Sequence, residues 1–155
     1  MFNSPMVRSL LVVIVVASLS CQARAGDWPG WRGPKGNGLS DEANLPVKWS
    51  AGDGVRWKAE LPGKGSGSPI IAGDRVFLTS SDGPRHDQLH FFCLNRRTGR
   101  ELWHRNFWGT APTLRHDPKS SMATPTPVTD GEFVWAFFGS GDLFCLDLDG
   151  NLVWC

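Results

Sequence analysis

After residue 25 the sequence has no stretch in which apolar residues recur at helical spacing, so we expect almost no helix. It also lacks a surplus of either charge, because 16 Lys and Arg stand against 15 Asp and Glu. The one adjacent basic pair, Arg96-Arg97, falls in an expected turn. A near-neutral surface of mixed sign offers no electrostatic footprint for a nucleic-acid backbone, and we expect no nucleic-acid partner.

Sequence motifs of several enzyme classes are missing as well. There is no G-x-S-x-G, and nothing else marks an activated nucleophile. The Gly-rich run 63–68 fits neither the P-loop nor the dinucleotide-binding pattern, and no helix is expected after it to present its N-terminus to a phosphate. The run is interpreted as a loop that leads into a strand.

The first 25 residues are typical of a secretory signal peptide. Arg8 supplies a positive n-region, residues 10–16 are all apolar, and Ala23-Arg24-Ala25 has the small-x-small pattern of a cleavage site. We therefore expect cleavage after Ala25 and a periplasmic or extracellular location. Two alternatives are a retained N-terminal anchor, for which the apolar run is short, and a lipid anchor at Cys21, because Leu19-Ser20-Cys21 loosely resembles a bacterial lipobox.

Loss of residues 1–25 would remove Arg8 and Arg24 and no acid, which leaves 14 basic against 15 acidic residues. It would also remove Cys21 and leave an odd number of cysteines, Cys93, Cys145 and Cys155, in an oxidising compartment. Cys93 and Cys145 hold the same place in two copies of a repeat. We therefore expect buried free thiols there rather than a disulfide.

The repeat consists of two similar sequence segments, residues 93–103 and 145–154. Each copy alternates apolar and polar residues, breaks at a Gly turn, and returns to an apolar stretch that ends in Trp, which is the pattern of a hairpin. Upstream of each copy a strand, a turn and a second strand are expected in 68–79 and 127–135. Two units of four strands result, and Trp57, Trp103 and Trp154 recur at intervals of 46 and 51 residues.

Residues 26–56 differ from the repeats because Gly and Pro crowd between Trp residues, which excludes a regular helix or a central strand. We expect an extended N-terminal arm over 26–56, laid along the body of the protein and pinned by Trp28, Trp31 and Trp49. The repeats then occupy 57–155.

The pattern Cys93-x-Asn95-x-x-Thr98-Gly99-x-x-x-Trp103 resembles the tryptophan-docking motif of the PQQ-like (quinoprotein) β-propeller family, A-x-D-x-x-T-G-x-x-x-W. The second copy is a degenerate match, with one residue deleted and no Thr. The opening residues 27–34, DWPGWRGP, resemble the N-terminus of secreted bacterial proteins of this family that are related to BamB.

The resemblance implies an all-β fold: a partial β-propeller of about two four-stranded antiparallel blades after an extended N-terminal arm. A closed ring needs four to eight blades, so we expect the chain to be the N-terminal part of a longer protein. In the family the motif ties one blade to the next. The residues that would do so here are Trp57, Cys93, Asn95, Thr98, Gly99, Trp103, Cys145, Asp147, Gly150 and Trp154.

Several residues are also candidate metal ligands, and for each we weigh metal binding against a structural role. His86, His90 and Cys93 invite a zinc hypothesis, but strand geometry sends residues 90 and 93 to opposite faces, and we expect surface histidines beside a core thiol. His104 and His116 have no carboxylate or Cys at ligand spacing. Residues 147–151 mimic part of a calcium loop without its later Glu, and a turn is expected.

Two functions from different classes follow. The first is a non-catalytic secreted binding or scaffold module with no cofactor, whose protein or small-molecule ligand meets loops such as 86–90 and 109–121. The second is part of a dehydrogenase that binds PQQ and calcium at the centre of the ring. Such enzymes often carry an adjacent Cys-Cys pair, which is absent here. A third idea keeps the chain as a complete β-sandwich of eight strands.

Overall fold

The computed structural model describes residues 26–111 and 120–155, so the predicted signal peptide and Cys21 lie outside the described residues. Within those ranges there is no helix, and eight strands form two four-stranded antiparallel sheets. The first sheet has β1 (Ile70–Ala72), β2 (Arg75–Asp82), β3 (Gln88–Asn95) and β4 (Glu101–Trp108). The second has β5 (Val128–Thr129), β6 (Phe133–Phe137), β7 (Leu143–Asp147) and β8 (Leu152–Trp154).

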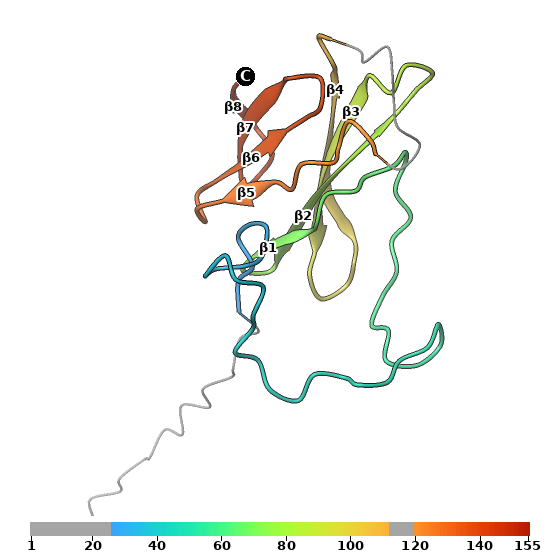
Figure 1. The fold of residues 1–155 in the computed structure, drawn as a ribbon, viewed down its shortest axis with the longest axis vertical. Helices are drawn as coiled ribbons and strands as arrows, with labels where there is room; N and C mark the ends of the chain where they lie inside the picture. The colour runs from blue at the N-terminus through green and yellow to red at the C-terminus, as the bar shows by residue number, and fades with distance from the viewer. Residues whose placement is uncertain (1–25, 112–119) are drawn as a thin grey trace, which may run out of the picture.

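Strand order in both sheets follows the chain, so each sheet is an up-and-down meander (Figure 1). The first strands of the two sheets, β1 and β5, lie next to each other, as inner strands of neighbouring blades do. The predicted fold class is confirmed: the described residues are all-β and form two four-stranded antiparallel sheets with the strand order expected of two propeller blades.

The main core lies between the two sheets and comes from one face of each. Period-two alternation sends Phe77, Phe91 and Trp103 of the first sheet toward Val134 and Leu146 of the second, and all five are buried. Phe107 and Phe144 stack across the interface with ring centroids 4.0 Å apart. Burial of large aromatic side chains at this interface is the main force that holds the sheets together.

Two cysteines occupy equivalent positions in this arrangement. Cys93 is opposite Trp103 in the first sheet, and Cys145 is opposite Trp154 in the second. Both are buried free thiols, which confirms the prediction for these residues, whereas Cys155 is exposed. Burial raises the pKa of Cys93 to about 12 and also raises the pKa of Cys145, so both thiols stay protonated at neutral pH.

The start of the arm crosses from one sheet to the other. Trp28 exchanges both backbone hydrogen bonds with Ile71 on the free edge of β1, at 2.9 Å each. The carbonyl of the next residue, Pro29, accepts a hydrogen bond of 2.8 Å from the N–H of Thr129 in β5. The arm therefore covers the free edges of both inner strands, which would otherwise present unpaired backbone groups.

The prediction that Trp31 and Trp49 pin the arm is wrong. Their side chains are 67% and 69% exposed, and Val47 nearby is 88% exposed. Of these three Trp residues, Trp28 is held against the sheets, because its backbone pairs with the open edge of β1. Its ring lies against Gly33 within the arm. The sequence led us to expect cover for all three Trp rings, and the structure leaves two of them exposed.

Residues 61–67 return along the first sheet before β1 begins. Lys64 pairs with Ser81 through two backbone hydrogen bonds of 2.9 Å, in the part of β2 that β1 does not reach. A Cβ on Gly65 would lie 2.2 Å from the carbonyl oxygen of Thr79. The alternating glycines of this run thus permit close backbone approach, in agreement with a segment that leads into a strand.

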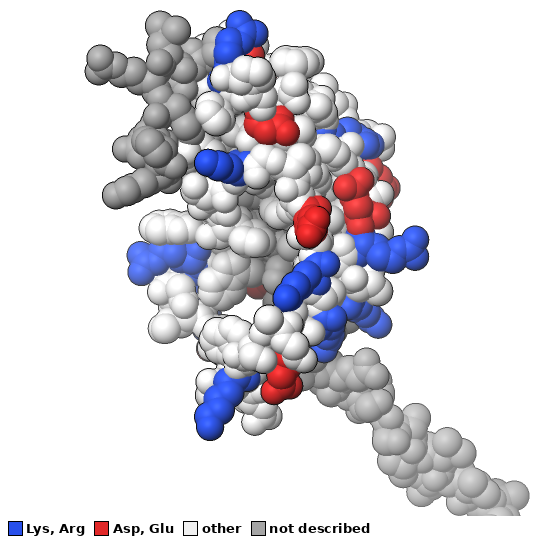
Figure 2. All heavy atoms as spheres, turned by 90° about the vertical axis from the view of Figure 1, so that its right-hand side faces the viewer, with Lys and Arg blue, Asp and Glu red and all other residues white. Residues whose placement is uncertain are grey.

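In the described ranges no helix is long and apolar enough to cross a membrane. Lys and Arg side chains are interspersed with Asp and Glu on the face shown in Figure 2.

Candidate functional site

The contacts between the sheets centre on Trp103, at the third position of β4. Its indole Nε1 donates a hydrogen bond of 2.9 Å to the carbonyl of Leu148 in the turn between β7 and β8. The ring lies against Gly150 in the same turn, where an added Cβ would be 2.6 Å from the ring carbon Cδ2. Gly150 has φ of +82°, a conformation that L side chains rarely adopt, so residue 150 has two reasons to be Gly.

The same contact occurs one unit earlier in the chain. Trp57, which precedes β1, donates a hydrogen bond of 2.8 Å from Nε1 to the carbonyl of Arg96. Its ring lies against Gly99, which has φ of +70° and where an added Cβ would be 2.5 Å from the ring. Each Trp therefore meets the glycine turn of the unit that follows it in the sequence.

Short polar side chains build these turns. In the first, Asn95 Oδ1 accepts hydrogen bonds of 3.0 Å from the N–H groups of Arg97 and Thr98, and one of 3.1 Å from the Thr98 hydroxyl. The backbone of Gly99 then donates to the carbonyl of Asn95 at 2.8 Å. These bonds present the glycine and the Arg96 carbonyl toward Trp57.

The second turn reaches the same result without a Thr. Asp147 Oδ1 accepts from the N–H groups of Asp149 and Asn151, and Asp147 Oδ2 accepts from the Asn151 side chain at 2.8 Å. The side-chain hydrogen bond from Asn151, with the backbone donors, lowers the pKa of Asp147. Asn151 thus takes the part of Thr98, and sequence reasoning missed it because the deletion shifts the register of the two motifs.

Two arginines of the first sheet also reach this second turn. Arg75 of β2 donates to the carbonyl of Leu148, and its other Nη lies 2.8 Å from Asp149 Oδ1. Arg105 of β4 donates from Nε to the carbonyl of Gly150 at 2.5 Å and lies over the Trp103 ring, 5.6 Å from its centroid. The acidic turn therefore meets two cations, which the repeat pattern alone did not indicate.

Trp154, the last Trp of the repeats, does not make the contact that Trp57 and Trp103 make. A transverse row in the first sheet, Ile70, Phe77, Cys93 and Trp103, is buried under the second sheet. The equivalent row in the second sheet is Val128, Trp135, Cys145 and Trp154. Trp154 is 46% exposed and Val128 48%, and no described carbonyl accepts a hydrogen bond from the Trp154 indole. This outer face has the composition of a docking face but is uncovered in the described part of the chain.

The predicted metal candidates do not converge. Cys93 lies on the core face of the first sheet, while His90 lies on the opposite face, and the described residues contain no group of three His, Cys, Asp or Glu that could hold a metal ion. The expectation of surface histidines is wrong for His90, which is 4% exposed. It also has partners that the sequence did not reveal: His104 at 3.0 Å and Asp82 at 2.9 Å. His116 lies outside the described residues.

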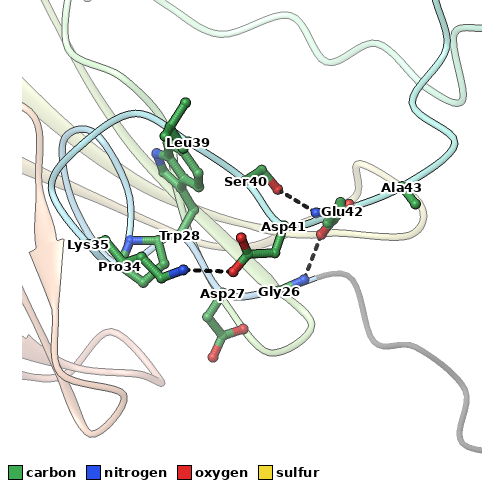
Figure 3. A pocket seen from close by; sticks show the side chains of 10 residues that line it. All are labelled: Gly26, Asp27, Trp28, Pro34, Lys35, Leu39, Ser40, Asp41, Glu42 and Ala43. Carbon is green, nitrogen blue, oxygen red and sulfur yellow. Dashed lines mark hydrogen bonds and ion pairs between the residues drawn. The ribbon is translucent and has the colours of Figure 1, made fainter.

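A separate hollow of about 540 Å³ lies within the arm (Figure 3). Trp28, Pro34 and Leu39 contribute apolar wall, and Lys35 forms an ion pair of 2.8 Å with Asp41 beside them. The side chains of that pair are 60% and 87% exposed, so the hollow is open to solvent and its polar groups already satisfy each other. Nothing in it resembles a set of catalytic groups.

At one end of the molecule the loops of the two sheets are joined. Thr110, just after β4, donates from its backbone N–H and its hydroxyl to Asp142, at 2.9 and 2.7 Å. Ser140 donates to the same carboxylate at 2.6 Å. Gly109 donates to the carbonyl of Asp87 at 2.8 Å. This joint ties Gly109 and Thr110, at the start of the second predicted ligand loop, to Asp87 and Asp142. Residues 112–119 of that loop lie outside the described part.

Comparison with known proteins decides the family. The family model described as outer membrane protein assembly factor BamB, a PQQ-type repeat family, matches residues 39–155. The chain belongs to this family. The predicted resemblance to PQQ-like propeller proteins is thereby confirmed, and the tryptophan contacts described above lie within the matched repeats.

The relatives that the chain matches extend well beyond it. It is 29% identical over 108 residues to the polyvinylalcohol dehydrogenase of Sphingopyxis sp. (strain 113P3), with 64% of this chain and 15% of the relative covered. The crystal structure of BamB from Moraxella catarrhalis has a TM-score of 0.45 and 24% identity over 64% of this chain and 26% of BamB. The chain thus spans a small part of the PQQ-type proteins that it matches.

Proposed function

We propose that this chain is part of an exported, non-catalytic binding or scaffold module of the BamB-type propeller family. The observation that carries the proposal is the use of the motif's polar groups. The indole N–H groups of Trp57 and Trp103 and the acceptors Asn95 and Asp147 are all engaged in contacts between units or within turns. None is left to act on a substrate.

Within this proposal the ten motif residues act as blade-docking residues. The rings of Trp57 and Trp103 each lie against a glycine, and each indole N–H donates to a backbone carbonyl that precedes this glycine in the same turn. Trp154, with its row of neighbours, would make the same contact with a further unit. That unit would be a blade whose turn offers a positive-φ glycine and a free carbonyl.

The ligand surface is assigned to the end of the blades where the Asp142 joint holds the loops. Asp87 is buried and pairs with Arg85 at 2.8 Å, which orders the loop between β2 and β3. Rigid loops on a sheet scaffold suit the binding of a protein or small-molecule ligand, since little chain entropy is lost on binding. The arm covers the free edges of β1 and β5, which supports a structural rather than a catalytic role for this side of the two sheets.

A second candidate is part of a PQQ- and calcium-dependent dehydrogenase, and the similarity to the polyvinylalcohol dehydrogenase favours it. Among the described residues no three His, Cys, Asp or Glu side chains lie together as a metal ion would require. The calcium-like run 147–151 uses the Asp147 carboxylate to close its own turn. No catalytic step is derived for this candidate.

An absorbance titration of the full-length protein with pyrroloquinoline quinone and calcium separates the two candidates. The scaffold proposal expects no saturable binding and no dye-linked alcohol oxidation. Stoichiometric binding together with alcohol oxidation would overturn it. Asp147→Asn is the matched variant, because a calcium site in the 147–151 run would lose affinity with it, whereas the scaffold proposal expects identical titrations.

Export is proposed from residues 1–25, with cleavage after Ala25 and a lipid at Cys21 as the alternative. Mass spectrometry of the protein recovered from the native host tests this. A mature N-terminus at Gly26 supports cleavage, a diacylglyceryl mass on Cys21 supports the anchor, and an intact Met1 contradicts both.

A further inference from the structure

The face of the first sheet that points away from the second sheet carries a chain of three hydrogen-bonded titratable groups. Asp82 ends β2, His90 lies in β3 and His104 lies in β4. His90 Nε2 is 2.9 Å from Asp82 Oδ1, and His90 Nδ1 is 3.0 Å from His104 Nε2. Both nitrogens of His90 are therefore engaged, one by a carboxylate and one by another imidazole.

The carboxylate fixes the positions of the protons. An ionised Asp82 can only accept, so His90 donates to it from Nε2–H. A neutral His90 then has a lone pair at Nδ1, and His104 must donate from its Nε2–H. The proton order is thus His104 to His90 to Asp82, with the free lone pair of the system on His104 Nδ1.

The surrounding side chains hold the two histidine rings in place. His90 is 4% exposed, and the His104 ring stacks on the buried ring of Phe92 with centroids 4.3 Å apart. Phe92 belongs to an apolar cluster that includes Trp57 and Leu61 of the segment leading into the first sheet. Ser80, opposite His90, donates to the carbonyl of Pro62 in that segment.

We propose that Asp82, His90 and His104 form an acid-sensitive lock that holds segment 57–62 on the first sheet. One added proton is accommodated at His104 Nδ1, and every hydrogen bond of the chain survives. The other ring lone pair of the chain is His90 Nδ1, and a proton placed there would face the His104 Nε2–H at 3.0 Å. Two donors and two like charges cannot stay at that distance, so His104 leaves Phe92 and uncovers the apolar cluster.

The charges around the pair set the direction of the effect. Burial lowers the pKa of His104, and His90 and Arg105 lower it further, whereas Glu101 and Asp82 oppose the shift. Lys58, Glu60 and Lys64 of the covering segment are exposed and are not among the groups that shift His104. Because His104 binds a proton less readily in the folded than in the unfolded state, stability is lost as pH falls below about 6.5, the ordinary pKa of His.

The test is a pH series on the full chain, read by NMR of the histidine ring nitrogens and by thermal melting. At pH 7.5 both His90 and His104 are expected as Nε2–H tautomers. Between pH 7.5 and pH 5 the Tm is expected to fall by about 5 °C more in the wild type than in His104→Gln. Gln places an amide donor near the Nε2 position but does not titrate.

His86→Asn is the matched control. It removes a histidine from the loop between β2 and β3, and Asn tolerates the φ of +55° found there. This variant is expected to keep the wild-type pH dependence of Tm. The proposal is overturned if His90 carries its proton on Nδ1 at pH 7.5, or if His104→Gln loses as much Tm in acid as the wild type. The tautomer measurement needs no variant, so it decides even if His104→Gln folds poorly.

Discussion

The ring of Trp103 occupies the space where residue 150 would carry a side chain, and residue 150 is Gly. An added Cβ at that position would come within 2.6 Å of the ring, while the indole N–H bonds the Leu148 carbonyl at 2.9 Å. The pair therefore fixes both the distance and the orientation of the second sheet relative to the first. The Trp57 and Gly99 pair repeats the relationship one unit earlier.

Loss of the Trp103 ring is expected to separate the sheets. Trp103→Ala removes a side chain that is 8% exposed and leaves the Leu148 carbonyl without its indole donor. The expected loss is about 3–5 kcal/mol of unfolding free energy, measured by urea denaturation. Trp49→Ala is the control because that ring is 69% exposed, and a change within about 0.5 kcal/mol is expected. Equal losses in the two variants would contradict the docking role.

Gly65 tests the close approach of the returning segment to β2. In Gly65→Ala the new Cβ would lie 2.2 Å from the Thr79 carbonyl oxygen, so the Lys64–Ser81 pairing has to open. We expect a Tm several degrees lower, corresponding to about 1–3 kcal/mol. Gly52→Ala has nothing within 4 Å of the added Cβ and should melt like the wild type. A Gly65→Ala protein with unchanged Tm would show that the segment does not pair with β2.

Arg75 and Asp149 test the charge match between the first sheet and the second turn. Their side chains are 30% and 76% exposed, so the expected coupling energy is about 0.5–1 kcal/mol. A double-mutant cycle of Arg75→Ala and Asp149→Ala measures it, and 1 M salt should reduce it. A coupling of zero at low salt would mean that Arg75 acts through the Leu148 carbonyl alone.

Cysteine reactivity tests the burial of the repeated thiols. Since the pKa of Cys93 is raised to about 12 by burial, iodoacetamide at pH 8 should label Cys155 and leave Cys93 unmodified in the folded protein. Peptide mass spectrometry distinguishes the sites, and labelling in urea is the positive control. Rapid labelling of Cys93 without denaturant would show that the two sheets open readily.

Acid stability tests the second turn. The hydrogen bond from the Asn151 side chain, with the backbone donors, lowers the pKa of Asp147 in the folded state. A carboxyl with a depressed folded pKa stabilises the fold above its ordinary pKa of about 3.9, and this contribution is lost as pH falls through the folded value. Asp147→Asn should flatten the fall of Tm with pH in that acid range. An unchanged slope would contradict the assignment.

Much of the local structure could be predicted from the repeat. The hairpin phrases, the four-strand count per unit and the equivalence of Cys93 and Cys145 follow from period-two alternation and turn residues, which depend on neighbours in the chain. The partners of the histidines could not be found in this way. His90 and His104 are 14 residues apart and meet only because the register of β3 and β4 brings them together on one face.

Two other features also depended on long-range packing. Trp28 and Trp31 lie in the same Gly- and Pro-rich run, yet only the backbone of Trp28 meets a strand edge, and the Trp31 ring is exposed. In the second turn Asn151 takes the place of Thr98, because its side-chain amide reaches Asp147 from four residues further along the chain, whereas Thr98 follows Asn95 by three. A motif written with fixed spacing does not contain that substitution.

The sequence by itself determined that the chain after residue 25 contains repeated antiparallel sheets, and the described residues hold no helix. Alternation, glycine turns and spaced Trp residues are short-range signals. Only the tertiary structure decided which groups meet across the sheets: Trp103 with Gly150, Arg75 with Asp149, and His90 with both Asp82 and His104. The reason is that these pairings depend on strand register and on the stacking of one sheet on the next, and neither is a property of any single segment.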